Sequence, residues 1–274
     1  MDIFKSYDVR GVYPEEINAS IVEAIGRAYV LHTKATRVAV GSDKRASSDE
    51  LRDALIRGLT TQGADVIDLG LISTPMLYFA SATLEVDGAI MVTASHNPGA
   101  YNGLKFTRRN AVPIGLSSGL SEIKSIALAG NFTPSDHVGS ITSEDIKPAY
   151  VSMLTAFATW DRTKRFHCST DTAHAMGVLE LDVLRALPSV TLCATLYDTL
   201  QLPGVCPHEA NPLQTETLIE LQHAVRSTKC DLGIAYDGDA DRIGFVDEKG
   251  RVVPMDLVTA LLARALLRTH PSAT

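Results

Sequence analysis

The sequence predicts an α/β protein of tandem three-layer α/β/α domains with mostly parallel, mixed sheets. Short apolar runs typical of buried strands alternate with amphipathic stretches typical of helices, and this alternation occurs twice in 274 residues. A strand, a helix and a second strand in succession favour a parallel pair joined by a right-handed crossover. The two units have no evident sequence identity, so the repeat indicates a shared architecture and no more.

Composition narrows the class of protein. Hydrophobic residues make up 45% of the chain and charged residues 21%, which is typical of a soluble globular protein. The net charge of -7 argues against a nucleic-acid partner or an acidic membrane surface. No membrane span and no signal peptide are expected, so the expected location is cytoplasmic. Without a Cys-x-x-Cys pair, the cysteines are expected to be reduced and buried rather than in disulfides or a zinc site: Cys168, Cys193, Cys206 and Cys230.

The first domain is expected over residues 1–146. Its parallel strands are predicted at 37–41, 65–69 and 88–92. Its helices are predicted to begin near Asn18 or Ser20, near Ser47 and near Ser73. A hairpin turning around 108–110, a helix over 120–127 and a polar link over 130–144 complete it.

The second domain is expected over residues 147–253. Its strands are predicted at 166–170, 190–194 and 231–236. Its helices are predicted at 148–158, 176–187 and 215–227. A long loop is expected at 200–213, and a hairpin is expected to pair 244–246 with 251–253. A strongly amphipathic helix follows Pro254, and its apolar side needs a partner. We expect residues 254–274 to be the first helix of an otherwise absent third domain, and the helix over 255–268 is a candidate surface for self-association.

Residues 93–98, Thr-Ala-Ser-His-Asn-Pro, are the first candidate site. They follow the buried run 88–92, and open α/β sheets place ligands at the carboxyl ends of such strands. Ser95 therefore either takes part in chemistry or belongs to a turn rich in Ser, Asn and Pro. This stretch alone leaves both interpretations open.

A second candidate loop places Asp237, Asp239 and Asp241 at alternate positions after a strand. Three carboxylates at this spacing suit Mg²⁺ or another hard divalent cation. An EF-hand is disfavoured because Arg242 stands where its turn glycine is required and the flanking segments resemble strands. A solvated acidic turn is the other alternative, and it is costly because the three charges repel each other.

Together the two loops favour phosphoryl transfer. A phosphoryl group on Ser95 would bring a charge of roughly -1.5 to -2, and three aspartates with one divalent cation would leave a further deficit. Acyl transfer is less favoured because the serine is not in a Gly-x-Ser-x-Gly elbow. The cations available to offset the charge are Arg242, His96, Lys105 and Arg10.

These segments resemble the α-D-phosphohexomutases, and among them the bacterial phosphomannomutase/phosphoglucomutase group. The resemblance rests on residues 93–98, 101–105 and 237–242, with further similarity at 7–11 and 207–213. It implies a reaction that interconverts hexose 6-phosphate and hexose 1-phosphate of mannose or glucose. The reaction would pass through a hexose 1,6-bisphosphate that turns around in the site.

The resemblance also implies roles for individual residues. Ser95 would be the phosphoserine, and it would hold one Mg²⁺ per chain together with Asp237, Asp239 and Asp241. Arg242 would support the phosphoryl group. Lys105, Arg10 and His96 would lie near the transferring proton and phosphoryl group, and Tyr7 would contact the substrate.

The chain departs from the family in ways that affect the expected activity. Family members have four domains, whereas only the first two and one helix are recognised here. Residues 42–47 carry a serine where an arginine is common, and Ala240 replaces a glycine; neither change removes a metal ligand. Because the missing domains would read the sugar and grip its far phosphate, little or no mutase turnover is expected. A phosphoglucosamine mutase and a non-catalytic truncated paralogue acting as a binding module remain as alternatives.

Overall fold

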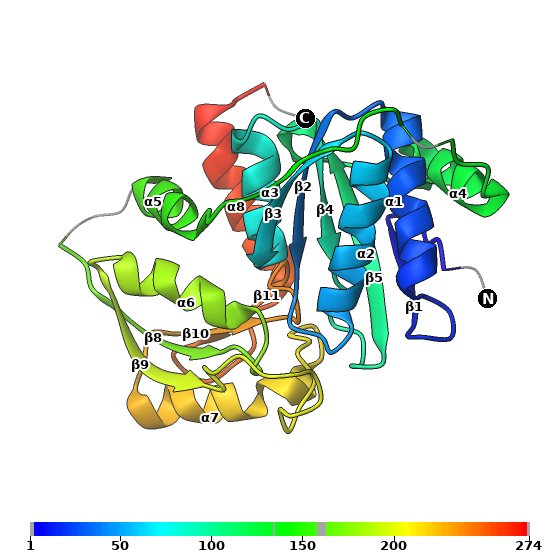
Figure 1. Ribbon diagram of the computed structural model, residues 1–274. Helices are drawn as coiled ribbons and strands as arrows, with labels where there is room; N and C mark the ends of the chain where they lie inside the picture. The colour runs from blue at the N-terminus through cyan, green and yellow to red at the C-terminus, as the bar shows by residue number, and fades with distance from the viewer. Residues whose placement is uncertain (1–2, 134, 158–162, 273–274) are drawn as a thin grey trace.

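A computed structural model describes residues 3–133, 135–157 and 163–272, which form two α/β units (Figure 1). Among these residues the first unit has a seven-stranded sheet in the order β1-β5-β4-β2-β3-β7, with β6 beside β5. The second unit has a four-stranded sheet in the order β11-β10-β8-β9. The predicted fold class of tandem α/β/α units with mixed sheets is confirmed.

The first sheet is parallel on one side and antiparallel on the other. Strands β4, β2, β3 and β7 run parallel, whereas β5 runs antiparallel to both β4 and β1. The strands are β1 Asp8–Val12, β2 Arg37–Ser42, β3 Asp65–Leu71, β4 Gly88–Val92, β5 Tyr101–Arg108, β6 Val112–Pro113 and β7 Ile141–Ser143. The predicted hairpin is confirmed as the β5–β6 pair, which turns through the 3-10 helix Arg109–Ala111.

Neither edge strand of this sheet, β1 or β7, was expected. Strand β7 lies within the stretch 130–144, for which the sequence predicts only a polar link. All of its residues are exposed, so no apolar pattern marks it. It is a strand because its main chain pairs with Val66–Asp68 of β3, and such pairing leaves no trace in hydrophobic periodicity.

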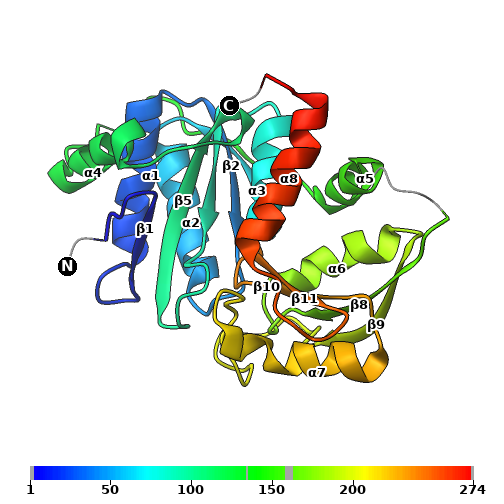
Figure 2. The ribbon, with the colours of Figure 1, turned by 180° about the vertical axis from the view of Figure 1, so that it is seen from behind.

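Helices cover both faces of the first sheet: α1 Ala19–Thr33 and α2 Ser48–Thr61 lie on one face, and α3 Thr74–Thr83 on the other (Figures 1 and 2). Helix α4 Leu120–Ala129 packs on α1. Asn18 and Ser73 cap α1 and α3 by accepting backbone N–H bonds, which satisfies donors that a helix start leaves unpaired.

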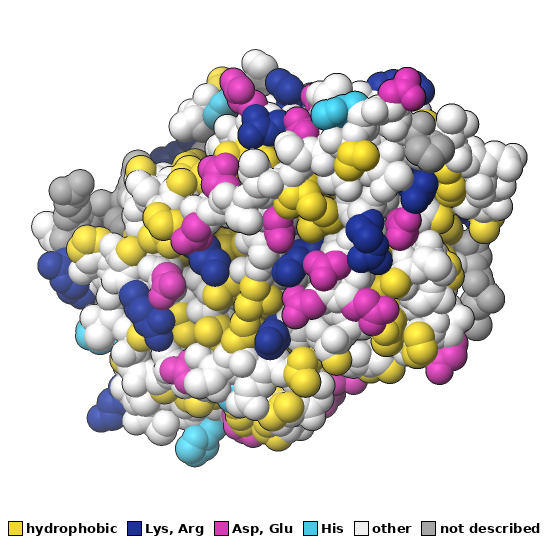
Figure 3. Space-filling view, in the orientation of Figure 1, with side chains coloured by type: hydrophobic (Ala, Val, Ile, Leu, Met, Phe, Trp, Pro, Cys, Tyr) yellow, Lys and Arg dark blue, Asp and Glu magenta, His cyan; other side chains and the backbone are white. Residues whose placement is uncertain are grey.

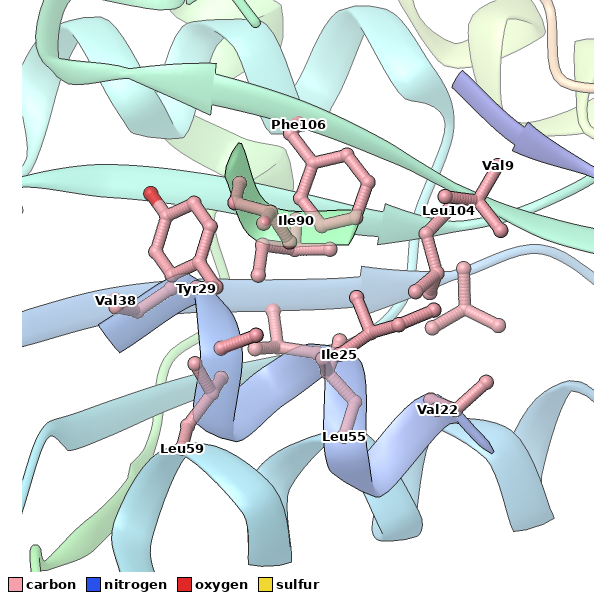
Figure 4. Packing of buried hydrophobic residues seen from close by; sticks show 14 of the residues in the cluster. Val9, Val22, Ile25, Tyr29, Val38, Leu55, Leu59, Ile90, Leu104 and Phe106 are labelled. Carbon is pink, nitrogen blue, oxygen red and sulfur yellow. The ribbon is translucent and has the colours of Figure 1, made fainter. Parts of the chain in front are cut away.

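The main core lies between the first sheet and the helices α1 and α2 (Figure 4). Tyr29 and Phe106 stack with their ring centroids 6.0 Å apart, beside the fully buried Leu55 and Leu59. Helices α1 and α2 approach closely at Gly58, where an added Cβ would lie 2.2 Å from the Glu23 carbonyl oxygen. This packing fixes the sheet whose strand ends carry the serine loop.

The second sheet has three parallel strands and one antiparallel strand. Its strands are β8 Phe166–Asp171, β9 Val190–Leu196, β10 Leu232–Tyr236 and β11 Ile243–Asp247, and β11 is the antiparallel partner of β10. Its helices are α5 Lys147–Phe157, α6 Gly177–Ala186 and α7 Ile219–Thr228, with α6 and α7 on opposite faces of the sheet (Figure 2). Residue 158, the predicted end of the first of these helices, lies outside the described residues. The predicted hairpin after 244–246 is confirmed: Val246 and Val252 form a bridge, and main-chain hydrogen bonds of 2.9 Å join Val253 N–H to the Phe245 carbonyl oxygen and Asp247 N–H to that of Arg251.

The predicted amphipathic helix after Pro254 is confirmed as α8, Met255–Thr269. None of its residues is buried. Five of its leucines are between 46% and 60% exposed: Leu257, Leu261, Leu262, Leu266 and Leu267. No described helix is both long and apolar enough to cross a membrane. On the face seen in Figure 3, charged side chains of both signs are interspersed with hydrophobic ones.

The expectation that all four cysteines are buried was wrong for Cys193. Cys168 and Cys230 are buried and Cys206 is partly buried, but Cys193 is exposed, and all four are free thiols. The register of β8 and β9 shifts at this point, since Leu192 and Ala194 face consecutive residues of β8. Along β9, exposed and partly buried residues alternate from Val190 to Cys193, and Cys193 shares the exposed side with Thr191.

Candidate active site

The two candidate loops meet where the carboxyl ends of the two sheets face each other. The Ser95 hydroxyl, at the end of β4, donates a hydrogen bond of 3.0 Å to Asp237 Oδ2, at the end of β10. Both residues are almost fully buried, at 1% and 0% exposed. The structure thus brings together side chains that lie 142 positions apart in the sequence.

The backbones of the two loops are also in contact. A Cβ added to Gly238 would lie 2.2 Å from the Ser95 carbonyl oxygen, so only glycine permits this approach. Ser95 and Ala240 have φ angles of +55° and +63°, in the left-handed region that non-glycine residues rarely adopt. Strained residues of this kind concentrate at functional sites.

The three aspartates converge as a metal site would require. Ligand oxygens of Asp237, Asp239 and Asp241 lie within 4.8 Å of one another. Asp239 Oδ2 accepts hydrogen bonds of 2.6 Å from the Thr74 hydroxyl and from Lys105 Nζ. Its other oxygen, Oδ1, is buried with no hydrogen-bond partner among the described residues. An unsatisfied buried carboxylate oxygen beside two further carboxylates fits a hard divalent cation.

Burial and repulsion set the proton affinity of this cluster. Burial, followed by the charges of Asp239 and Asp241, raises the pKa of Asp237 to about 7. Lys105 Nζ lies 2.6 Å from both Asp239 Oδ2 and Asp241 Oδ2. Burial opposes the charge of Lys105, but the two aspartates outweigh it and raise the Lys105 pKa. Lys105, one of the residues predicted to offset the charge, thus partly neutralises the acidic loop.

The two predicted arginines flank the serine. The Arg242 backbone N–H donates to Asp237 Oδ1 at 2.9 Å, and its Nε lies 3.9 Å from Asp237 Oδ2. Arg10 reaches the serine loop by donating to Asn97 Oδ1 at 2.7 Å, and it also pairs with Asp8. Both guanidinium groups line the cleft described below, where they offset negative charge.

His96 and Tyr7 occupy different positions relative to the serine. His96 Nδ1 lies 3.4 Å from Ser95 Oγ; burial, and then the positive charges of Arg242 and Arg10, lower its pKa. Tyr7 is 78% exposed and does not touch the serine loop by any hydrogen bond of the described residues. It lines an open cleft of about 660 Å³ together with Arg10, Tyr78, Lys105, Asp241 and Arg242.

An arginine that the sequence did not single out, Arg45, holds the serine loop. Arg45 donates from Nη2 to the carbonyl oxygens of Ser95 (2.7 Å) and Asn97 (2.9 Å), and from Nη1 to those of Pro98 and Tyr101 (2.9 Å each). It is only 6% exposed. A buried arginine with four carbonyl partners fixes the loop backbone on which the Ser95 side chain depends.

Asp43 completes this support. Its carboxylate pairs with Arg45 Nε at 2.9 Å and accepts hydroxyl bonds from Ser48 and Thr93, each at 2.7 Å. The Thr93 hydroxyl in turn accepts the Ser95 backbone N–H at 2.9 Å. Burial raises the Asp43 pKa, although Arg45 opposes this effect. In the sequence, only their position could have pointed to these two residues. Asp43 and Arg45 come just after β2, and β2 is the neighbour of β4.

Comparisons with known proteins point to one family along most of the chain. The family model described as phosphoglucomutase/phosphomannomutase, alpha/beta/alpha domain I, matches residues 1–134, and the domain II model matches residues 148–250. The chain is 36% identical to a phosphomannomutase of Salmonella montevideo over 277 residues, and 34% identical to one of Vibrio cholerae over 281 residues. Each alignment covers 98% of this chain and 60% of the relative.

A solved structure agrees in fold. The crystal structure of a phosphoglucomutase/phosphomannomutase family protein from Burkholderia thailandensis superposes with a TM-score of 0.88 at 30% identity. It covers 98% of this chain and 59% of that chain. The chain therefore spans about three fifths of the length of the relatives that it matches.

Proposed function

Since the chain belongs to the phosphoglucomutase/phosphomannomutase family, we propose that it carries the phosphoserine and metal half of a hexose-phosphate mutase site. The observation that supports this most directly is the 3.0 Å hydrogen bond between Ser95 Oγ and Asp237, which joins the two loops. We assign the serine loop to a first domain over 1–146 and the acidic loop to a second over 147–253.

In the proposed reaction Ser95 carries a phosphoryl group and passes it to a hexose phosphate. A sugar hydroxyl oxygen bonds to phosphorus as the bond between phosphorus and Ser95 Oγ breaks. The hydroxyl proton passes to a neighbouring base, which returns a proton to the departing Ser95 Oγ. The His96 imidazole, 3.4 Å from Ser95 Oγ, is well placed for this exchange. Phosphoryl transfer depends mainly on positioning and charge neutralisation, and Arg242, Arg10 and Lys105 supply positive charge around Ser95.

We assign a Mg²⁺ site to Asp237, Asp239 and Asp241, together with an oxygen on Ser95. The unpartnered Oδ1 of Asp239 supports this assignment. When bound, the ion would neutralise negative charge on the phosphoryl oxygens. The residues of the chain contribute the rest: Lys105 holds Asp239 and Asp241 in place, and Thr74 orients Asp239.

The substrate of the proposed site is a hexose phosphate, with hexose 1,6-bisphosphate as intermediate. Because the chain covers about 60% of its relatives, we propose that these 274 residues alone bind the far end of the sugar poorly. They would then accept a phosphoryl group but turn over slowly.

Intact-mass spectrometry tests the proposed half-site. We expect the chain incubated with glucose 1,6-bisphosphate and Mg²⁺ to hold one phosphoryl group, and Ser95→Ala to hold none. Ser125→Ala, an exposed serine on α4, is the control and should behave as the native chain does. Absence of a phosphoryl group under every condition would contradict the proposed function. Fast mutase turnover in a preparation free of longer enzymes would contradict only the proposed slow turnover.

A further inference from the structure

A second cavity, of about 320 Å³, lies between the two units and shares no lining residue with the cleft around Arg10 and Lys105. Its walls come from the segment after β2, residues 96–99 of the serine loop, residues 173–176 after β8, the loop 201–210, and Gly238. Its volume is within the range of small-molecule sites. Of the residues assigned to the proposed mutase half-site, only His96 lines this cavity.

The topology explains why a cavity forms here. From β2 the chain goes to β3 on one side and returns to β4 on the other, so the order reverses between β2 and β4. In the second sheet, β9 and β10 likewise lie on opposite sides of β8. Open α/β sheets bind ligands outside the carboxyl ends of strands at such switch points. In this chain two switch points line one cavity.

One wall carries an imidazole ring that is held at both nitrogens. His208 Nε2 lies 3.1 Å from Asp171 Oδ2, and His208 Nδ1 lies 2.9 Å from the Glu209 carbonyl oxygen. Both ring nitrogens therefore face acceptors, which an imidazolium satisfies by donating twice. The hydrogen bond to Asp171 raises the His208 pKa, while partial burial opposes this.

The neighbouring wall is held in a strained backbone. Ala173 and His174 have φ angles of +49° and +56°, two consecutive non-glycine residues in the left-handed region. Ala173 N–H donates to Asp171 Oδ1 at 3.0 Å, and His174 Nδ1 lies 2.7 Å from the Thr199 carbonyl oxygen. The Tyr197 ring packs edge-on against both imidazoles, with centroids 5.2 Å from His174 and 5.3 Å from His208. Strain maintained by this many contacts is typical of a binding site.

The charges of the lining favour an anion. Asp43 is neutralised by Arg45, 2.9 Å away, which leaves exposed Glu209 as the other acidic lining residue. Lys44 contributes positive charge, His208 places both ring nitrogens against acceptors, and His96 and His174 add further ring nitrogens to the lining. The remaining lining is largely apolar: Pro98, Ala173, Ala175, Met176, Pro203, Pro207 and Ala210.

We propose that this cavity is a binding site for a small organic anion, a phosphate or a carboxylate on an apolar body. Lys44 donates to the anionic group, the His208 ring supplies charge, and Met176 and Pro203 contact the apolar body. Because residues 96–99 and Gly238 form part of the wall, an occupant would touch both loops of the candidate active site. The proposal does not depend on the chemistry at Ser95.

The Met176 methyl group is a direct reporter, because Met176 lines the cavity and is 1% exposed. Chain labelled with ¹³C at the methionine methyl groups is titrated with phenyl phosphate, with benzoate and with uncharged phenol. We expect a saturable shift of the Met176 signal with at least one anion, and at least about tenfold weaker binding of phenol. The Met153 signal, from helix α5 outside the cavity, should stay unchanged. Binding of phenyl phosphate alone would indicate a phosphate site, and binding of benzoate alone would indicate a carboxylate site.

Variants locate the binding. Lys44→Gln, on an exposed side chain, should weaken the anion by about tenfold, whereas Lys249→Gln in an exposed turn should not. Arg242→Gln alters the other cleft and should leave the Met176 response intact. The proposal is overturned if neither anion moves the Met176 signal, if phenol binds as well as the anions, or if Lys44→Gln leaves their affinity unchanged.

Discussion

At the residue scale, the contact between the two loops depends on a missing side chain. Gly238→Ala would place a Cβ 2.2 Å from the Ser95 carbonyl oxygen, so the loops must separate. We expect a loss of about 1–3 kcal/mol in the free energy of unfolding, measured by urea denaturation. Gly99→Ala is the control, since its Cβ would meet Pro203 at 3.2 Å and should cost less. Equal stability of Gly238→Ala and the native chain would show that this approach is not tight.

Arg45 and Asp43 form a buried ion pair beneath Ser95, only 3% exposed at each side chain. Arg45→Met leaves the Asp43 carboxylate buried without its partner, and we expect it to cost about 3–5 kcal/mol. The double variant Asp43→Asn with Arg45→Met should cost less than the sum of the single changes, because the stranded charge is removed. Urea unfolding of the four proteins measures this coupling, and additive costs would argue against it.

The chemically active residues of the site could be predicted from the sequence, but the residues that hold the serine loop in place could not. Ser95 and the aspartates carry chemistry that their neighbours and spacing suggest. Arg45 looks like an ordinary polar turn residue, since its role depends on β2 lying next to β4. That adjacency is a property of the folded sheet, and it comes from strands 50 residues apart.

At the element scale, periodicity located the buried strands and capped helices well. It failed for the edge strands β1 and β7, and all three residues of β7 are exposed. It also did not place β5 between β4 and β1, although it found the hairpin that β5 opens. Edge pairing and strand order depend on long-range contacts, which a local pattern does not contain.

Three helices meet at one buried carboxylate. Glu180 of α6 accepts hydrogen bonds from Ser73, the cap of α3, at 2.6 Å and from Tyr150 of α5 at 2.9 Å. Burial raises its pKa, and the two hydroxyls oppose this effect. The native chain therefore binds this proton more tightly than the unfolded chain, so its contribution to stability is lost as the pH rises through the folded-state pKa.

Glu180→Gln removes this titration. We expect the free energy of unfolding of Glu180→Gln, relative to that of the native chain, to increase between pH 5 and pH 8. Urea unfolding at several pH values measures the difference. Glu248→Gln, on an exposed turn, is the control and should show no such trend. A difference that stays constant with pH would mean that Glu180 does not titrate in this range.

At the scale of the whole molecule, both units present the carboxyl ends of their parallel strands to each other. This single arrangement creates the contact between Ser95 and Asp237 and the cavity lined by residues 96–99 and Gly238. The sequence indicated two units of one architecture, and it could not indicate how they face each other. The relative placement rests on contacts such as Thr74 with Asp239 and Ser73 with Glu180.

Helix α8 is the one α-helix of the described chain that has no buried residue, and its leucines form an apolar surface. Since surfaces of this kind mark interaction sites, we predict concentration-dependent self-association through α8. Leu261→Lys should abolish it in sedimentation velocity, and should change the free energy of unfolding of the dilute chain by less than about 0.5 kcal/mol. Leu221→Ala, on a fully buried leucine of α7, should instead cost about 2–5 kcal/mol. A native chain that stays monomeric at every concentration would show that these leucines do not bind a second copy.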